Sequence, residues 1–224
     1  KISPAKISLT PLGFDSVTYR PIDPNNNAQK ENDRAILSQF DLTPGYLLFV
    51  GTLEPRKNIE GLIKAYSLLA PQLQDNHQLV IVGAKGWFYD QIFTLVDTLK
   101  LQSKIVFLGR VEDTALPSLY RQAKLFLFPS FYEGFGLPAL EAIACGIPVI
   151  TANCSSLPEV VGPAGRQVDP NKPEHIMGAI KELLTDQDVY KAVVRLTSSQ
   201  SARFNWQKTA QQTITAFWQV INKK

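Results

Sequence analysis

The hydrophobic pattern of the chain switches between two periods from residue 46 onward. Short apolar runs, typical of strands, are followed by stretches with the 3.6-residue period of amphipathic helices. Runs that are apolar at nearly every position indicate strands covered on both faces, as in a parallel sheet. The expected strands are YLLFVG (46–51), QLVIVG (78–83), IVFLG (105–109) and KLFLFPS (124–130), with weaker signals at IPVIT (147–151) and GRQVD (165–169).

Helical periodicity fills the segments between these strands. Apolar residues recur on one face after Asn58, a residue type that caps helix N-termini. Before the first strand, residues 21–30 are polar, and we expect a loop there. Further helices are expected at 89–100, at 114–123, from Pro138 onward, near 157–161, and in two or three closing segments that end with 205–221.

This alternation predicts an α/β fold, a Rossmann-like doubly wound parallel sheet of about six strands with helices on both faces. We expect an N-terminal segment and linker at 1–30, the Rossmann-like domain at 31–204 and a C-terminal helix at 205–224. In a sheet of order 3-2-1-4-5-6, the first and fourth strands are neighbours, and a ligand crevice opens at their carboxyl ends. The loops TLEPRKN (52–58) and FYEGFG (131–136) would face each other across that crevice.

Composition and charge exclude several classes of function. Of the 224 residues, 45% are hydrophobic, enough for a sizeable core, and the formal net charge is only +3. Basic residues are spread along the chain, so we expect no nucleic-acid partner. The two cysteines and two histidines do not have the spacing of a disulfide framework, a metal site or a Ser-His-Asp triad.

The sequence shows no signal peptide and no apolar run of the roughly 18 residues that span a membrane. It begins with Lys1 in a segment that resembles the middle of a protein. We therefore expect a fragment of a longer polypeptide.

Two adjacent cations mark the first loop. Arg56 and Lys57 precede the first predicted helix of the sheet region. A guanidinium can grip two phosphate oxygens and an ammonium can act as a point charge. Solvated surface cations are the simpler interpretation, but the position just after a buried strand favours an anion-binding role.

The second loop, YEGFGLPALEA (132–142), combines glycines, a proline and two glutamates. Pro138 suits the first position of a helix, so the N-cap falls at Gly136 or the leucine after it, and neither offers a capping side chain. We therefore expect the N–H groups of Ala139 and Leu140 to be free for a phosphate.

The glutamates of this loop, Glu133 and Glu141, would be repelled by a phosphate but can accept hydrogen bonds from hydroxyls. Ordinary structural roles are also open: Glu141 favours the helix dipole in the first turn or so of its helix, and Glu133 could be a solvated loop residue. A ligand that offers phosphates with hydroxyls on both sides is a sugar nucleotide.

The stretch EGFGLPALE resembles the E-x7-E motif of retaining glycosyltransferases with the GT-B fold, the glycosyl transferase group 1 family. Its neighbours resemble consecutive blocks of that family, from about PLGFD (11–15) to the last helix, and match only the C-terminal, donor-binding half. These neighbouring blocks are GTLEPRKN, VFLGRVED, LYRQAKLFLFPS, EAIACGIPVITANCSSLPEVVGPAGRQVDP and FNWQKTA.

The chain departs from the family pattern at Thr52, where many members carry Arg. Arg56 could supply that charge instead.

The resemblance implies a role for each matching position. Glu141 would hold the ribose hydroxyls, Glu133 would contact the transferred sugar, and Lys57 would pair with the diphosphate. Lys57 and Glu133 are the implied catalytic residues. The implied donor-binding residues are Gly51, Arg56, Lys57, Arg110, Val111, Glu133, Gly134, Phe135, Gly136, Leu137 and Glu141.

The resemblance also implies retaining, metal-independent transfer from a nucleoside-diphosphate sugar, with no cofactor. Within the family, the segment GTLEPRKN slightly favours members that transfer mannose from GDP-mannose. The implied partners are the nucleotide sugar and an N-terminal acceptor domain of the same polypeptide. A cytoplasmic location is implied, with peripheral membrane association through that domain. We expect this fragment alone to be inactive. The final helix carries Trp206, Phe217 and Trp218, which would face the missing domain or pack on their own domain.

Two alternative functions stay open. A glycoside hydrolase would also use two carboxylates, here Glu133 and Glu141. A non-catalytic module that binds a nucleotide or a protein is the other, because a fold alone does not establish activity.

Overall fold

The computed structural model describes residues 2–87 and 89–222. Its centre is a six-stranded sheet in the order β3-β2-β1-β4-β5-β6, and every neighbouring pair is parallel. The predicted fold class and strand order are confirmed. The strands are Leu47–Val50 (β1), Leu79–Val82 (β2), Ile105–Gly109 (β3), Leu125–Phe128 (β4), Val149–Ala152 (β5) and Gly165–Val168 (β6).

The inner strands are apolar because both faces of the sheet are covered. Every residue of β2, β4 and β5 is buried, and β1 is buried except for its partly exposed last residue. The edge strand β3 is only partly buried. Leu47 of β1 lies beside Leu79 of β2 on one side and Leu125 of β4 on the other, which aligns the carboxyl ends of the central strands.

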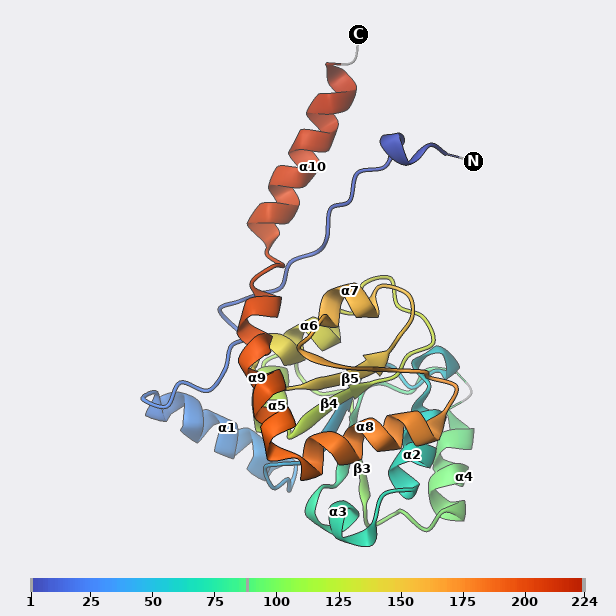
Figure 1. Ribbon diagram of the computed structural model, residues 1–224. Helices are drawn as coiled ribbons and strands as arrows, with labels where there is room; N and C mark the ends of the chain where they lie inside the picture. The colour runs from blue at the N-terminus through green and yellow to red at the C-terminus, as the bar shows by residue number, and fades with distance from the viewer. Residues whose placement is uncertain (1, 88, 223–224) are drawn as a thin grey trace.

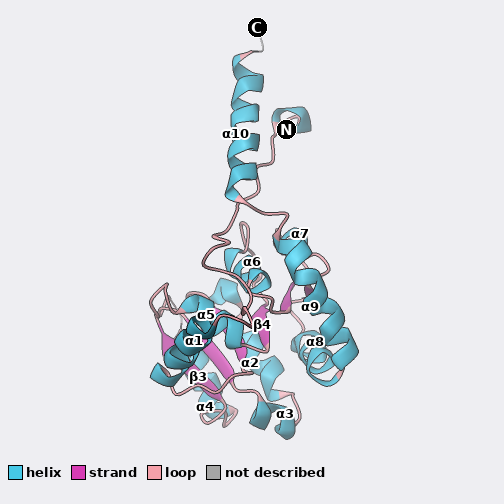
Figure 2. Ribbon diagram, turned by 90° about the vertical axis from the view of Figure 1, so that its left-hand side faces the viewer, coloured by secondary structure: helices cyan, strands magenta, loops and turns pink. Residues whose placement is uncertain are grey.

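Helices flank the sheet on both sides, as Figures 1 and 2 show. One group forms around α2, which packs against α4 and α8, and another forms where α1 packs against α5. The helices are α1 (Asn27–Gln39), α2 (Ile59–Ser67), α3 (Pro71–Asn76), α4 (Asp90–Thr98), α5 (Leu116–Gln122), α6 (Leu137–Ala144), α7 (Leu157–Val161), α8 (Pro173–Thr185), α9 (Gln187–Ser201) and α10 (Trp206–Ile221), with short 3-10 turns η1 (Pro4–Lys6) and η2 (Pro55–Lys57).

Helix α1 corrects the prediction of a loop at 21–30. It begins at Asn27, and the buried carboxylate of Asp33 fixes it to α5. Asp33 accepts hydrogen bonds from the hydroxyl of Ser118 at 2.7 Å and from Nε of Arg121 at 2.9 Å. Such a contact between distant segments leaves no periodic apolar signal in the sequence. The short helix α3 was not predicted either.

Asn58 also differs from its prediction as a helix cap. It occupies the N-cap position of α2 with a left-handed backbone (φ 56°), but its side chain does not cap the helix. The amide nitrogen of Asn58 instead donates to the carbonyls of Pro129 (3.1 Å) and Pro170 (2.7 Å). Asn58 thus ties the loop after β1 to the loop after β4.

Helix α10 stands away from the body, and the N-terminal segment runs beside it (Figures 1 and 2). The two segments cross where the hydroxyl of Thr209 donates to the carbonyl of Pro11. At Gly13, a β-carbon would lie 2.3 Å from the backbone nitrogen of Trp206. No described residue of α10 is buried, so this helix does not pack on its own domain, and Phe217 is 64% exposed.

No helix within the described ranges is long and apolar enough to cross a membrane. Residues 1, 223 and 224 of the predicted terminal segments lie outside the described residues. The predicted division at residues 30 and 204 stays a prediction.

Candidate active site

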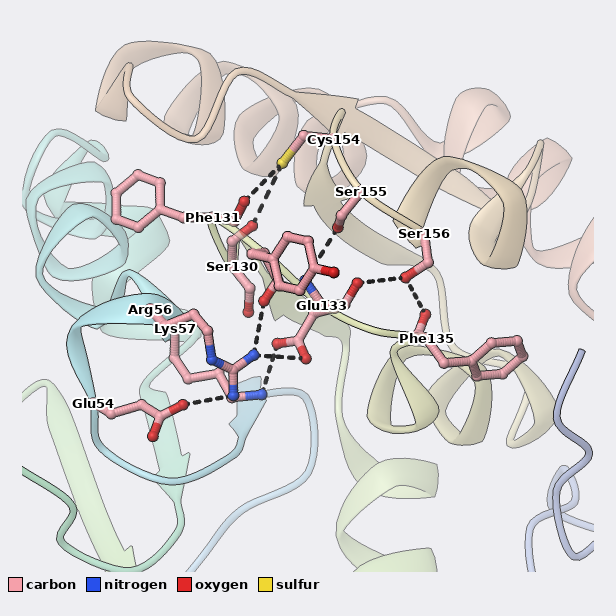
Figure 3. Close-up of polar contacts among 11 residues, drawn as sticks. Glu54, Arg56, Lys57, Ser130, Phe131, Glu133, Phe135, Cys154, Ser155 and Ser156 are labelled. Carbon is pink, nitrogen blue, oxygen red and sulfur yellow. Dashed lines mark hydrogen bonds and ion pairs between the residues drawn. The ribbon is translucent and has the colours of Figure 1, made fainter. Parts of the chain in front are cut away.

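The loops after β1 and β4 meet at the carboxyl edge of the sheet, as the strand order requires (Figure 3). The backbone N–H of Phe131 donates to the carbonyl of Arg56 at 2.9 Å, which joins the two loops directly. The structure therefore brings the loop of Arg56 and Lys57 together with the loop of Glu133, as the strand order predicts.

Glu133 lies between the two predicted cations (Figure 3). Its Oε1 is 2.6 Å from Nζ of Lys57, and its Oε2 is 3.1 Å from Nη1 of Arg56. Lys57 and Glu133 are both buried. Arg56 is also paired with Glu54, at 2.6 Å. From the sequence, Glu133 is expected to contact hydroxyls, and no sequence pattern indicates these ion pairs.

Lys57 is held in a defined position at the end of η2. Asn58 reverses the chain directly after it, and Nζ of Lys57 lies 4.8 Å from the centre of the Phe128 ring of β4. An ammonium group has three N–H donors, and Glu133 occupies one of them. Lys57 can therefore hold Glu133 and a second anion together.

Two serines that are not among the predicted site residues fix the loop around Glu133. The N–H of Glu133 donates to Oγ of Ser155 at 3.1 Å. Oγ of Ser156 donates to the carbonyls of Glu133 (3.0 Å) and Phe135 (2.8 Å). Both serines follow β5, whose carboxyl end lies next to that of β4. Their place in the predicted strand order was the signal that could have found them.

The start of α6 corrects one prediction. Gly136 is the N-cap, with a left-handed φ of 101°. The N–H groups of Ala139 and Leu140 are not free, because both donate to the carbonyl of Gly136, at 3.0 and 3.2 Å. An N-cap carbonyl already accepts the first intrahelical bonds. In the described structure, none of the backbone N–H groups of residues 134–137 (Gly134, Phe135, Gly136 and Leu137) has an acceptor.

Glu141 is half-buried within α6, and the hydroxyl of Tyr120 donates to its Oε2 at 3.0 Å. Burial raises the pKa of Glu141 to about 7, while the hydrogen bond from Tyr120 lowers it and the charge of Asp113 raises it. Its ionisation therefore changes near neutral pH. In the described part of the chain, Glu141 makes no ion pair with Lys57 or Arg56.

Gly51, Arg110 and Val111 line one cavity of about 310 Å³ at the carboxyl ends of β1, β2 and β3. A second cavity, of about 380 Å³, is lined by Glu133, Gly134 and Phe135 together with the two serines. The predicted site residues thus form three groups. The first is the ion-paired cluster with the unpaired amides of residues 134–137, the second is the half-buried Glu141, and the third lines the cavity beyond β1.

This arrangement is suited to an anion with polar groups on both sides. Arg56 and Lys57 are paired with Glu54 and Glu133 but keep further N–H groups, and the row of unpaired amides adds more donors for an anion. Among the residues that the structure describes, no three His, Cys, Asp or Glu side chains gather as a metal-binding group.

The chain belongs to the family described as glycosyl transferases group 1, whose model matches residues 29–200. It is 43% identical over 183 residues to the O-antigen chain mannosyltransferase B of Escherichia coli. That match covers 81% of this chain and 48% of the relative, so the chain spans about half of the relative's length.

Two solved structures show the same fold. HepE of Anabaena, solved in complex with UDP and glucose, superposes with a TM-score of 0.78 at 22% identity, over 92% of this chain and 55% of HepE. The C-terminal domain of the group 1 family protein LpcC of Francisella tularensis superposes with a TM-score of 0.70 at 22% identity, over 85% of this chain and 97% of that domain. The chain has the fold of the C-terminal domain of a GT-B glycosyltransferase.

Proposed function

We propose that this chain is the donor-binding domain of a glycosyltransferase that transfers a sugar from a nucleoside diphosphate to an acceptor, with retention of configuration at the transferred sugar. The observation that carries the proposal is the cluster of Lys57, Arg56 and Glu133 beside four open backbone amides. This combination binds a diphosphate and leaves a carboxylate for a neighbouring hydroxyl.

The diphosphate lies against Lys57 and Arg56 and accepts hydrogen bonds from the amides of residues 134–137. When the bond between the anomeric carbon and the phosphate oxygen breaks, the nucleoside diphosphate leaves with increased negative charge. Lys57 stabilises that charge from a buried position, where electrostatic interactions are stronger than in water. These protein cations take the part that a metal ion has in other transferases, so we propose that the reaction is metal-independent.

The sugar lies on one side of the diphosphate and the nucleoside on the other. Glu133 contacts the sugar hydroxyls in the cavity that it shares with Gly134 and Phe135. Glu141 accepts hydrogen bonds from the ribose hydroxyls, for which it must be ionised. The base enters the cavity lined by Gly51, Arg110 and Val111.

We propose mannose as the sugar and GDP-mannose as its donor. The support is the 43% identity to a relative that is named as a mannosyltransferase. Because the chain spans about half of that relative, we also propose an acceptor-binding domain in the same polypeptide, without which the fragment does not turn over.

A glycoside hydrolase is disfavoured by the contacts of Glu133. Both of its oxygens face cations, an environment that suits a hydrogen-bond acceptor for sugar hydroxyls and not a general acid for a glycosidic oxygen.

Calorimetric titration of the chain with GDP, UDP and ADP tests the proposal. We expect GDP to bind at least tenfold more weakly to Lys57→Met than to the unmodified chain. Lys64→Met is the matched control, because Lys64 is an exposed cation of α2 whose one ion pair among the described residues is with Glu60, at 3.8 Å. Failure of all three nucleotides to bind, or equal affinity in the two variants, would overturn the proposal.

A further inference from the structure

A cavity of about 320 Å³ lies beside α2, and the proposed function does not use it. Three loops line this cavity: the loop after β1 with Glu54, the loop after β4 with Phe131, and the loop after β6 with Pro170. The start of α2 lines it as well, at residues 59–61. Because all three loops follow the carboxyl ends of parallel strands, the cavity lies at the same edge of the sheet as the candidate active site.

Arg56 lies between this cavity and the one that Glu133 lines (Figure 3). Its Nη2 is 2.6 Å from Oε1 of Glu54, and its Nη1 is 3.1 Å from Oε2 of Glu133. One guanidinium group thus bridges a carboxylate of each cavity. A ligand in the cavity of Glu54 would therefore lie next to the place proposed for the transferred sugar.

Glu54 supplies this cavity with a hydrogen-bond acceptor. The residue is 6% exposed, and Arg56 holds its Oε1. Among the described residues, its Oε2 has no hydrogen-bond partner. A buried carboxylate oxygen needs a donor to offset its desolvation, and a hydroxyl of a ligand can supply one.

The start of α2 supplies hydrogen-bond donors. Asn58 is its N-cap residue, but the Asn58 side chain does not cap the helix. In the part of the chain that the structure describes, none of the backbone N–H groups of residues 59–61 has an acceptor. Such groups at a helix N-terminus require a partner from outside the helix. Donors and an acceptor thus line the same cavity.

Phe131 adds an aromatic ring to these polar groups. Its side chain points away from Glu133 (Figure 3), and the residue is 43% exposed. Its backbone is fixed, because its N–H donates to the carbonyl of Arg56 at 2.9 Å and its own carbonyl accepts from Sγ of Cys154 at 3.2 Å. An exposed ring on a fixed loop is available to pack against a ligand.

A sugar unit matches this combination better than other classes of ligand do. Its hydroxyls both donate and accept, and the C–H groups on one face of its ring pack against aromatic rings. An anion would be repelled by the carboxylates of Glu54 and Glu60, which both line the cavity. A cation would meet the positive end of α2, and an apolar ligand would leave the oxygen of Glu54 and the amides without partners.

We propose that this cavity binds one sugar unit of a carbohydrate acceptor, with Phe131 stacking on the ring and Glu54 and the amides of residues 59–61 bonding to its hydroxyls. The inference rests on the proposed function and names the acceptor as a chain of sugars. This domain then holds a unit of the acceptor itself, in addition to the donor.

NMR titration of the isotope-labelled chain with α-linked mannotriose tests the proposal, because a chain that is extended with mannose ends in mannose units. GDP-mannose is present at saturation, so the place of the donor sugar is filled. We expect the N–H signals of residues 59–61 to shift, with an affinity within about twofold of that measured without GDP-mannose. If GDP-mannose abolishes the binding of mannotriose, the trisaccharide had occupied the place of the donor sugar, and the inference is overturned.

Phe131→Ala should weaken mannotriose binding about fivefold, and Phe131→Tyr, which keeps the ring, should bind within about twofold of the unmodified chain. Phe217→Ala is the matched control, because Phe217 is an exposed phenylalanine of α10 that does not line the cavity. An unchanged melting temperature shows that each variant is folded. Equal affinity in Phe131→Ala and the unmodified chain, or no shift at residues 59–61, would overturn the inference. Binding of no nucleoside diphosphate would instead overturn the proposed function.

Discussion

Nζ of Lys57 lies 2.6 Å from Oε1 of Glu133, although the two residues are 76 positions apart in the sequence. Both side chains are buried, so water and salt screen this ion pair little. Because Arg56 holds the other carboxylate oxygen, Glu133 orients both cations before a ligand arrives. Positive charge that is already oriented needs no rearrangement when a diphosphate binds.

Replacing Lys57 should affect stability as well as binding. Among the described residues, Lys57→Met leaves the buried Glu133 with Arg56 as its one remaining cation. We expect the free energy of unfolding to fall by about 3 kcal/mol. Urea unfolding measures this loss. In the double variant Lys57→Met/Glu133→Gln the buried charge is gone, so part of the stability should return while nucleotide binding stays lost. An equal stability of the double and the single variant would contradict this account of the ion pair.

The stability of the protein should depend on pH through Glu141. Burial raises the pKa of Glu141 from 4.5 to about 7, so between these values the folded protein holds a proton that the unfolded chain has released. The contribution of this group is therefore fully present below pH 4.5 and is lost as the pH rises through 7, by up to about 3 kcal/mol. Urea unfolding between pH 5 and pH 8 should show this decline.

In Glu141→Gln the decline should be smaller, because the titrating group is gone. Glu112→Gln removes an exposed acid and should leave the decline as it is in the unmodified chain. Identical pH dependence in all three proteins would show that Glu141 is not the group responsible.

Tyr120 should set the pH at which the donor binds. Its hydroxyl group lowers the pKa of Glu141, so Tyr120→Phe raises that pKa further. Since ionised Glu141 is the proposed ribose acceptor, the midpoint of GDP binding against pH should move upward. Tyr46→Phe is the control, because the Tyr46 hydroxyl makes a buried 2.7 Å bond to the carbonyl of Leu119 and none to Glu141. If the pH midpoints of GDP binding were equal in Tyr120→Phe and Tyr46→Phe, Tyr120 would not control the ionisation of Glu141.

We expect Ser156 to contribute to GDP affinity indirectly, because its hydroxyl holds the loop that carries Glu133. Ser156→Ala removes the only side-chain hydroxyl that donates to the carbonyls of Glu133 and Phe135 within the described residues. We expect about fivefold weaker GDP binding, with a loss of about 1 kcal/mol in the free energy of unfolding. Ser199→Ala removes an exposed hydroxyl of α9 that, in the described part of the chain, donates to the carbonyl of Leu196 in its own helix, and should change neither quantity. A Ser156 variant with unchanged affinity would show that the tether is not needed.

Much of the fold could be predicted from the sequence because buried parallel strands are apolar along their whole length. That signal located β1 to β4, and weaker signals located β5 and β6. The topological rule for doubly wound sheets then brought the loops of Lys57 and Glu133 together. Helix α1 could not be found in this way, because its anchor is a buried pair between Asp33 and Arg121, 88 positions apart.

The contacts within the site could not be predicted from local sequence patterns either. Which amides are free at the start of α6 depends on where the carbonyl of Gly136 points, and residue type does not encode that direction. Ion pairing of Glu133 with Lys57 and Arg56 requires two loops at hydrogen-bond distance, whereas the strand pattern predicts only that both loops lie at the same edge of the sheet. Local patterns and the family resemblance indicate candidate residues, and tertiary contacts decide which partners these residues have.

The crossing of Pro11 with Thr209 has a consequence for the order of folding. These residues are 198 positions apart, and closing a flexible loop of that length costs about 5 kcal/mol in chain entropy. Once the sheet exists, Phe204 packs against Phe135, which brings the start of α10 close and shortens the remaining free chain. We expect the crossing to form last, so pulse-labelled hydrogen exchange should show protection of β1–β6 before that of residues 205–209. Simultaneous protection would mean that the crossing assists assembly of the sheet.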